Sequence, residues 1–190
     1  MKRITLAFCT ILLLTTLKNV SAQSADDMKK WQDFMTPGAM HKWLAKYNGD
    51  WDVEMTSFMD PTNPQKSKGT GVYTSMMNGL YQSGDFKSDM MGMPFHGHSI
   101  TGYDNAKKLF VSTWVDNFGS GIIYMTGTYD EATKTLNLKG TQTDPITGKD
   151  AFIREEMKII SDDAYNLFMY GPGPDGKEML FMSGVFKRKK

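Results

Sequence analysis

Two histidines and a methionine-rich stretch are the residues of this sequence best suited to hold a metal ion. The 190-residue chain contains 16 methionines, three of them within residues 90–93. His96 and His98 lie two apart on a predicted strand, a spacing that puts both imidazoles on one face. Thioethers favour Cu(I), and imidazoles favour Cu(II) or Zn(II). Met93, His96 and His98 are therefore candidate ligands for copper or zinc, with His41 as a candidate third imidazole.

The methionines also have a structural interpretation, because a flexible thioether fills gaps in a hydrophobic core. Residues 90–93 would lie in a hairpin loop. Metal binding is therefore the alternative hypothesis rather than the leading one. Five further methionines fit the alternation of core residues: Met55, Met125, Met157, Met169 and Met182.

Asp116 and His41 are the side chains that could serve as an acid or a base. Trp114 and Asp116 share one face of a predicted strand, but Asp116 also begins an Asp-Asn-Phe-Gly turn that a carboxylate commonly caps. Glu155 and Glu156 are adjacent, so they face opposite sides and cannot act as a pair. The sequence contains no Gly-x-Ser-x-Gly elbow, zinc-protease motif or phosphate loop. We expect a non-catalytic protein, with an enzyme acting on a small hydrophobic substrate as a third hypothesis.

The first 22 residues have the pattern of a secretory signal peptide. Lys2 and Arg3 precede an apolar run over residues 4–17, and Val20-Ser21-Ala22 provides a small-residue cleavage site. The run is too short for a stable membrane span, which leaves an N-terminal anchor as the less favoured alternative. We therefore predict a signal peptide over 1–22 and a periplasmic or secreted mature chain.

Charge and cysteine content limit the kinds of partner and of metal site expected for the mature chain. Removal of residues 1–22 takes away three basic residues and no acid, which leaves 19 basic and 21 acidic residues. No basic stripe remains, so nucleic-acid binding is not expected. The single cysteine, Cys9, lies in the leader, so the mature chain has no disulfide or thiolate metal site.

The mature chain begins with a predicted helical segment over 23–48. Met40, Trp43, Leu44 and Tyr47 recur at helical spacing, and Asn48-Gly49 ends the pattern. From residue 49 to 190 the period changes to two, with short β-forming runs separated by turn residues. Strands are predicted near 50–59, 68–77, 80–89, 95–103, 108–116, 121–129, 134–142, 151–160, 164–170 and 177–187.

Short connections between these runs predict antiparallel pairing of neighbouring strands. Ten such strands would leave exposed edges unless the sheet closes on itself. The sequence therefore predicts an all-β protein, an antiparallel up-and-down β-barrel of about ten strands with one or two N-terminal helices at one end.

Two features resemble the calycins, the group that contains lipocalins and fatty-acid-binding proteins. Gly49-Asp50-Trp51 is a Gly-x-Trp at the start of the first strand, and Arg188 ends the last strand. The resemblance implies that Trp51 closes one end of the barrel and that Arg188 packs over its indole. A guanidinium on an indole face contributes about 0.5–2 kcal/mol.

A resemblance to the bacterial secreted family known as domain of unknown function 1579 extends over nearly the whole mature chain. It implies the barrel fold and brings no established activity. The chain departs from the family pattern at Asn78-Gly79-Leu80, where one glycine of the usual pair is missing. The motifs that carry the resemblance are PGAMHKWL (37–44), GDWDV (49–53), PFHG (94–97), GYDN (102–105), WVD (114–116) and DPITGK (144–149).

The leading hypothesis is non-catalytic binding of a small hydrophobic ligand inside the barrel. Aromatic residues on the strands could line a cavity with a few polar groups, as in many small-molecule sites. A barrel filled by its own side chains is the alternative. No cofactor is expected, since a heme barrel usually needs a wall histidine and none follows His98. The candidate binding residues are Trp51, Tyr73, Tyr81, Trp114, Tyr124, His41 and Asp116.

Overall fold

A computed structural model describes residues 24–90 and 92–190 of the chain. The predicted signal peptide over 1–22 lies outside the described residues, as does Met91 from the methionine-rich stretch. Both therefore stay predictions from the sequence.

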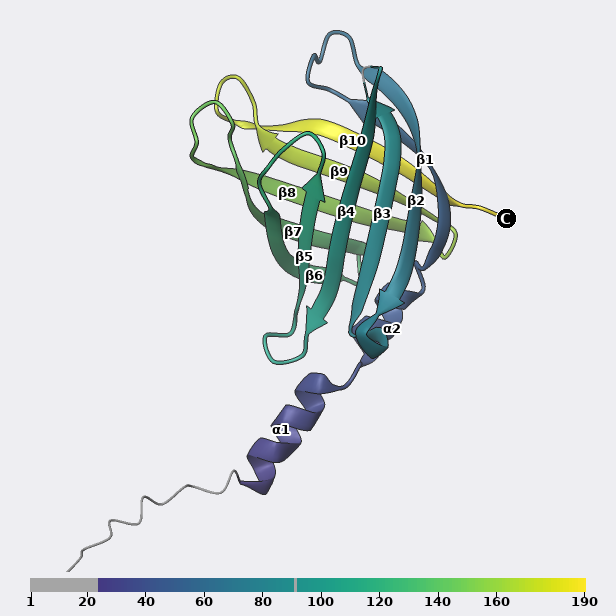
Figure 1. Ribbon diagram of the computed structural model, residues 1–190, viewed down its shortest axis with the longest axis vertical. Coiled ribbons are helices and arrows are strands. Elements are labelled where there is room, and N and C mark those ends of the chain that lie inside the picture. Colours follow the sequence, from purple (N-terminus) through teal and green to yellow (C-terminus); the bar gives the residue numbers. More distant parts are fainter. Residues whose placement is uncertain (1–23, 91) are drawn as a thin grey trace, which may run out of the picture.

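Two helices precede ten strands, and the strands close into one antiparallel barrel (Figure 1). The predicted fold class is confirmed, with both helices present. Each strand lies near its predicted range. The helices are α1 (Ala25–Met35) and α2 (Ala39–Ala45), and a short 3₁₀ helix, η1, spans Met77–Gly79. The strands are β1 (Gly49–Ser57), β2 (Gln65–Met76), β3 (Tyr81–Met90), β4 (Met93–Asp104), β5 (Leu109–Asp116), β6 (Ile123–Asp130), β7 (Thr135–Thr143), β8 (Asp150–Ser161), β9 (Ala164–Pro172) and β10 (Glu178–Arg188).

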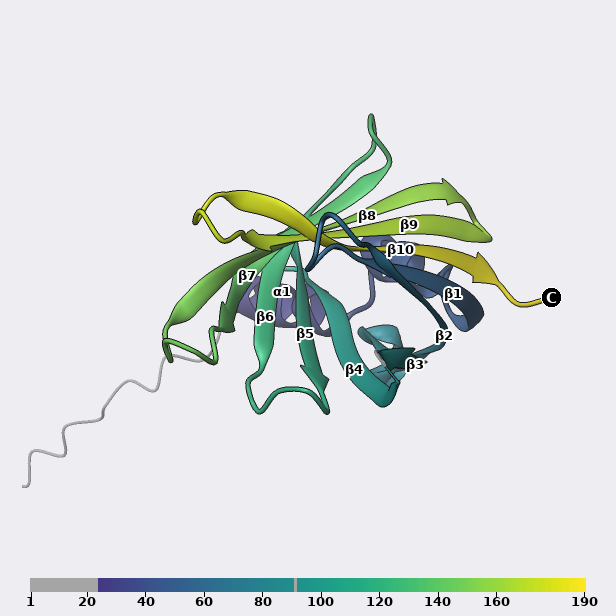
Figure 2. The ribbon, with the colours of Figure 1, turned by 90° about the horizontal axis from the view of Figure 1, so that it is seen from above.

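Pairing of the first strand with the last removes both edges of the sheet. Every other neighbour in the barrel is also a neighbour in sequence, so the topology is up-and-down. Trp51 on β1 lies opposite Arg188 on β10, and Ser57 lies opposite Met182 at the other end of the same pair. Seen from above, β8, β9 and β10 lie on one side of the barrel and β3 and β4 on the other (Figure 2).

Alternation along each strand divides residues between the inside and the outside of the barrel. On β1, Trp51, Val53 and Met55 are buried inside. Small residues on the inner face make room for large ones. At Gly97 on β4, an added Cβ would lie 2.0 Å from Cζ2 of Trp114, so only glycine fits beside that indole.

Helix α2 covers one end of the barrel, which we call the closed end. Trp43 packs against Phe110, with ring centroids 5.3 Å apart, and Leu44 is buried beside it. The Gln82 side chain on β3 donates a hydrogen bond to the Leu44 carbonyl at 3.0 Å. The connections at the opposite end, such as residues 117–122 between β5 and β6, form what we call the far end.

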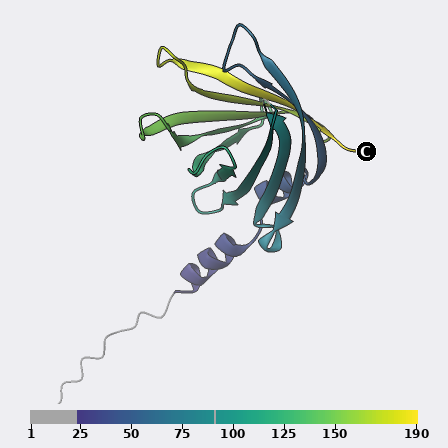
Figure 3. The same cartoon turned by 45° about the horizontal axis from the view of Figure 1, so that its top comes forward.

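Helix α1 stands away from the barrel (Figure 3). None of its residues is buried, and its apolar side chains, including Trp31 and Phe34, are exposed. The Asn105 side chain donates hydrogen bonds to carbonyls at the end of this helix, at 2.9 Å to Asp33 and 2.8 Å to Thr36. Of the helices that the structure describes, none is long and apolar enough to cross a membrane.

Candidate functional site

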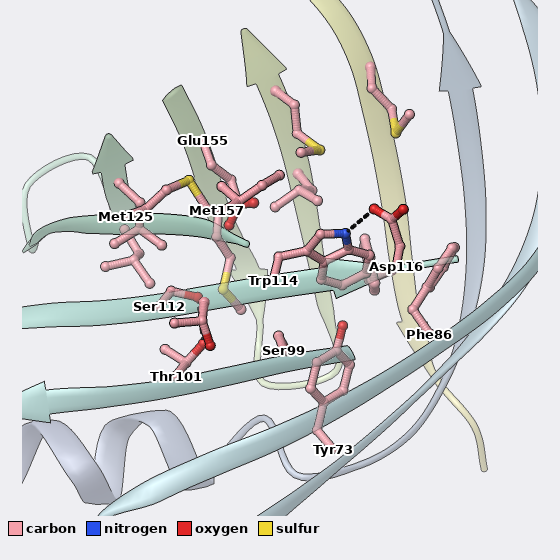
Figure 4. A pocket seen from close by; sticks show the side chains of 18 of the residues that line it. Tyr73, Phe86, Ser99, Thr101, Ser112, Trp114, Asp116, Met125, Glu155 and Met157 are labelled. Carbon is pink, nitrogen blue, oxygen red and sulfur yellow. Dashed lines mark hydrogen bonds between the residues drawn. The ribbon is translucent and has the colours of Figure 1, made fainter. Parts of the chain in front are cut away.

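A cavity of about 330 Å³ occupies the inside of the barrel (Figure 4). All ten strands contribute to its wall, together with residues of the closed end. The volume lies near the lower limit for small-molecule sites, which span about 300–1,000 Å³. Much of the wall consists of methionine and phenylalanine side chains: Met55, Met90, Met125, Met157, Met169, Met182, Phe86, Phe95, Phe118, Phe181 and Phe186.

Glu155 on β8 brings a carboxylate into this apolar interior (Figure 4). Its partners on the two neighbouring strands, Leu138 and Met169, are both apolar. Burial raises the pKa of Glu155 to about 7, and no hydrogen bond or charge among the described residues offsets that effect. The carboxylate therefore titrates near neutral pH with no protein group paired to it.

Two phenols share the interior with Glu155. Burial raises the pKa of Tyr73 to about 12, and it raises the pKa of Tyr165 well above its ordinary value. The negative charge of Glu155 contributes to both shifts in the same direction, as a smaller effect. Both phenols therefore stay protonated at neutral pH and can donate hydrogen bonds.

A short row of hydroxyl groups crosses strands β4 and β5 on the cavity wall. The Thr101 and Ser112 hydroxyls are 2.9 Å apart and hydrogen-bonded. Ser99 lies on the same face of β4, beside the ring of Tyr73 (Figure 4). Each of these hydroxyls can still accept a hydrogen bond from a molecule in the cavity.

At the far end of the cavity, Asp116 links the wall to the turn that follows β5. Its Oδ2 accepts a hydrogen bond from Nε1 of Trp114 at 2.7 Å, and its Oδ1 accepts one from the Phe118 backbone N–H at 2.9 Å (Figure 4). Asp116 therefore lies beside the Trp114 indole and also caps the turn that follows β5. The sequence had suggested each of these two placements.

Only some of the seven predicted ligand-binding residues reach the cavity. Tyr73, Trp114 and Asp116 line the cavity. Trp51 points inward but is completely buried below the cavity, where its Nε1 donates to the Tyr47 carbonyl at 3.1 Å. It belongs to the closed end and is not part of the cavity wall.

Tyr81 and Tyr124 lie on the outer surface of the barrel, so the expectation that they line a cavity is wrong. They are 40% and 50% exposed, respectively. Their neighbours Gln82 and Met125 take the inward positions.

His41 is buried at the closed end rather than reaching into the cavity, which also corrects the prediction. Its Nδ1 accepts a hydrogen bond from the Gly38 N–H at 3.0 Å, and its ring packs edge-on against Tyr103. Burial lowers its pKa, an effect partly opposed by a hydrogen bond to the Tyr103 backbone. His41 therefore holds α2 in place as a neutral side chain.

His96 and His98 do share one face of β4, on the outside of the barrel. Their common neighbour is Asp85, whose Oδ1 lies 3.1 Å from Nδ1 of His98 and 3.4 Å from Nε2 of His96. Met93 has the opposite strand parity and thus points to the other side, which separates it from the two imidazoles. Across residues 24–90 and 92–190, no group of three His, Cys, Asp or Glu side chains is placed to hold a metal ion.

Glu155 was not among the predicted site residues, although the sequence carried a signal for it. It has the same strand parity as Ile153 and Met157, which predicts an inward side chain. Glu156 next to it faces outward, where it pairs with Arg154. The predicted separation of the two glutamates is therefore confirmed, and it is the inward one that matters for the cavity.

A family model, described as a protein of unknown function (DUF1579), matches residues 36–188. The chain belongs to this family. The predicted resemblance is thus confirmed over the barrel and α2. No curated protein matches the DUF1579 chain in sequence.

Two solved structures are similar to this DUF1579 protein in fold. Rv2717c from M. tuberculosis has a TM-score of 0.63 and 11% identity, over 82% of this chain and 100% of its own. The S-type phycobiliprotein lyase CPES from Guillardia theta has a TM-score of 0.55 and 10% identity, over 85% of this chain and 97% of its own. At these identities the likeness concerns the fold alone.

Proposed function

We propose that this DUF1579 protein binds a small, largely apolar molecule inside its barrel. The observation that supports the proposal is the cavity itself, which combines a mostly apolar wall with an unpaired carboxylate, two phenols and a row of hydroxyls. A site of this composition orients a ligand through a few polar groups while its apolar surface provides the affinity. The phycobiliprotein lyase shares only the fold, so the proposal stands on the cavity.

We also propose that binding takes place in the periplasm or outside the cell, on the basis of the leader sequence. Native mass spectrometry of protein purified gently from its producing cells tests both points. We expect a chain that begins at Gln23 and carries added mass in the organic range. An intact leader would contradict the compartment, and a stoichiometric metal ion would favour the alternative hypothesis.

A pair of tryptophan substitutions on β8 tests whether the cavity is the binding site. The neutral dye N-phenylnaphthylamine fluoresces when it enters an apolar site. Met157→Trp fills the cavity and is expected to abolish dye binding, whereas Ile160→Trp adds the same side chain on the exposed outer face. Equal binding by the two variants would place the dye elsewhere and contradict the proposal.

A further inference from the structure

The charged groups of the cavity are of one sign. Glu155 and Asp116 are its two carboxylates, and among the described residues that line it there is no Lys, Arg or His. A fatty acid would therefore bring a second buried anion beside Glu155, with no cation to neutralise either one. The cavity wall therefore disfavours ligands with a carboxylate headgroup.

We infer that the cavity selects apolar molecules that carry a protonated amine, with Glu155 as the counter-ion. This inference rests on the proposed function and specifies the class of ligand. Glu155 supplies the negative charge, and the residues directly opposite it on the neighbouring strands, Leu138 on β7 and Met169 on β9, are both apolar. An ammonium group would provide the opposite charge and several N–H donors.

The remaining wall suits such a group as well. Serine and threonine hydroxyls on β4 and β5 are further hydrogen-bond acceptors on the cavity wall. The rings of Phe95 and Trp114 are stacked with centroids 6.3 Å apart on the cavity wall, and Phe86 lies beside them. Aromatic faces attract alkylammonium ions when water is excluded.

Binding of an amine by Glu155 depends on pH, because the carboxylate must be ionised. The titratable groups that face it are Tyr73 from β2 and Tyr165 from β9, and both stay neutral across the working range. Asp116 from β5 lies at the far end and is held by Trp114 and the following turn. The pH dependence near neutrality is therefore expected to come from Glu155 itself.

Three matched eight-carbon probes separate the headgroups: octylamine, octanol and octanoate. Each is titrated against the dye-loaded protein, and its dissociation constant is obtained from dye displacement. At about pH 8, where Glu155 is ionised and an alkylamine is still protonated, octylamine is expected to bind at least roughly tenfold more tightly than octanol. Octanoate is expected to bind most weakly.

Glu155→Gln keeps the size of the side chain and removes its charge. It is expected to weaken octylamine binding at least roughly tenfold, because the amine loses its ion pair. The affinity for octanol is expected to stay within about threefold, because the substituted side chain still offers the alcohol a hydrogen-bonding group of the same size. Glu156→Gln, one residue away on the outer face, is expected to change neither affinity. A drop to about pH 5 in the wild-type protein is expected to weaken octylamine in the same way, because it protonates Glu155.

The outcomes distinguish this inference from the function on which it rests. Octylamine affinity that is equal in Glu155→Gln and wild type, or octanoate as the tightest probe, would overturn the selection for amines while the cavity remains a binding site. Failure of the dye and all three probes to bind would instead overturn the proposed function. The wild-type pH series does not depend on the folding of any variant.

Discussion

Arg188 at the closed end and Glu155 in the cavity are both charged side chains on the inner side of the barrel, and their surroundings differ. The Arg188 guanidinium stacks 4.5 Å from the centroid of the Trp51 ring. It also donates hydrogen bonds to the carbonyls of Lys46, Asn48 and Asp162 and to the Asp163 carboxylate. Glu155 has an apolar neighbour on each side and no partner among the described residues.

The difference distinguishes a charge that stabilises the fold from a charge that has no partner within the protein. A fully paired charge such as Arg188 fixes the chain around it, and here it joins the end of β10 to the loop before β1. An unpaired buried charge costs stability and persists only where something else compensates it. The closed end therefore serves the integrity of the barrel, and the cavity is the region to which the proposed function assigns ligand binding.

Truncation of the two inner tryptophans is the largest test of this contrast. Trp51→Ala is expected to reduce the free energy of unfolding by about 3–5 kcal/mol, because it empties a completely buried site. Trp114→Ala, which only enlarges an existing cavity, is expected to cost about 2 kcal/mol. Urea unfolding of both variants measures the difference, and a larger loss for Trp114→Ala would reverse the assignment.

The second test uses the pH dependence of stability. The pKa of Glu155 is about 7 in the folded protein against an ordinary value of 4.5, so the folded state binds more protons between those values. Stability is therefore lost as pH rises through that window, by up to about 3 kcal/mol. Glu155→Gln is expected to be more stable than wild type by that amount at about pH 8 and nearly equal at about pH 4.

The comparison between wild type and Glu155→Gln removes the contribution of His41. The lowered pKa of His41 makes stability rise with pH, opposite to the effect of Glu155. The reason is that the folded state binds fewer protons at His41 than the unfolded chain does just below pH 6.5. That effect is present in both proteins and cancels in the difference. Parallel stability curves across the whole range would show that Glu155 is solvated or paired, contrary to our account.

Much of the closed end could be predicted from the sequence, whereas the cavity could not. Gly-x-Trp and the late arginine identify a local arrangement, and the structure confirms the contact between Arg188 and Trp51. Strands and turns were also predictable, because the alternation of residue types and the turn residues are local signals. Whether the enclosed space is filled depends on the summed volumes of all ten strands, which no local pattern contains.

The errors at Tyr81 and Tyr124 have a related cause. On β3 the inward positions hold Gln82, Gly84 and Phe86, so polarity does not mark the inner face. On β6, Tyr124 lies between Ile123 and Met125, and three apolar residues in a row do not reveal which face is inside. Only the register with neighbouring strands resolves the two faces.

A third prediction compares two arginines with different partners. Arg188→Lys is expected to cost about 1–2 kcal/mol, because a single ammonium cannot reproduce the fork that reaches three carbonyls. Arg154→Lys, on the outer face, is expected to cost less than about 1 kcal/mol, since its partners Glu156 and Glu178 are partly exposed carboxylates. Urea unfolding of the two variants measures the difference, and an equal loss for both would contradict the special role of the carbonyl contacts of Arg188.

The smallest expected effect concerns Asp116, the other carboxylate of the cavity. Asp116→Asn keeps one acceptor oxygen, so it retains the hydrogen bond from either the Trp114 N–H or the Phe118 N–H and loses the other. Because the site lies at the partly exposed far end, we expect a loss of about 1 kcal/mol. Octylamine affinity is expected to stay within about threefold of wild type, since Glu155 and not Asp116 lacks a protein partner. If Asp116→Asn weakened octylamine as strongly as Glu155→Gln does, the anchor for the ligand would lie at the far end of the barrel. The contrast between a paired and an unpaired carboxylate would then no longer explain selectivity.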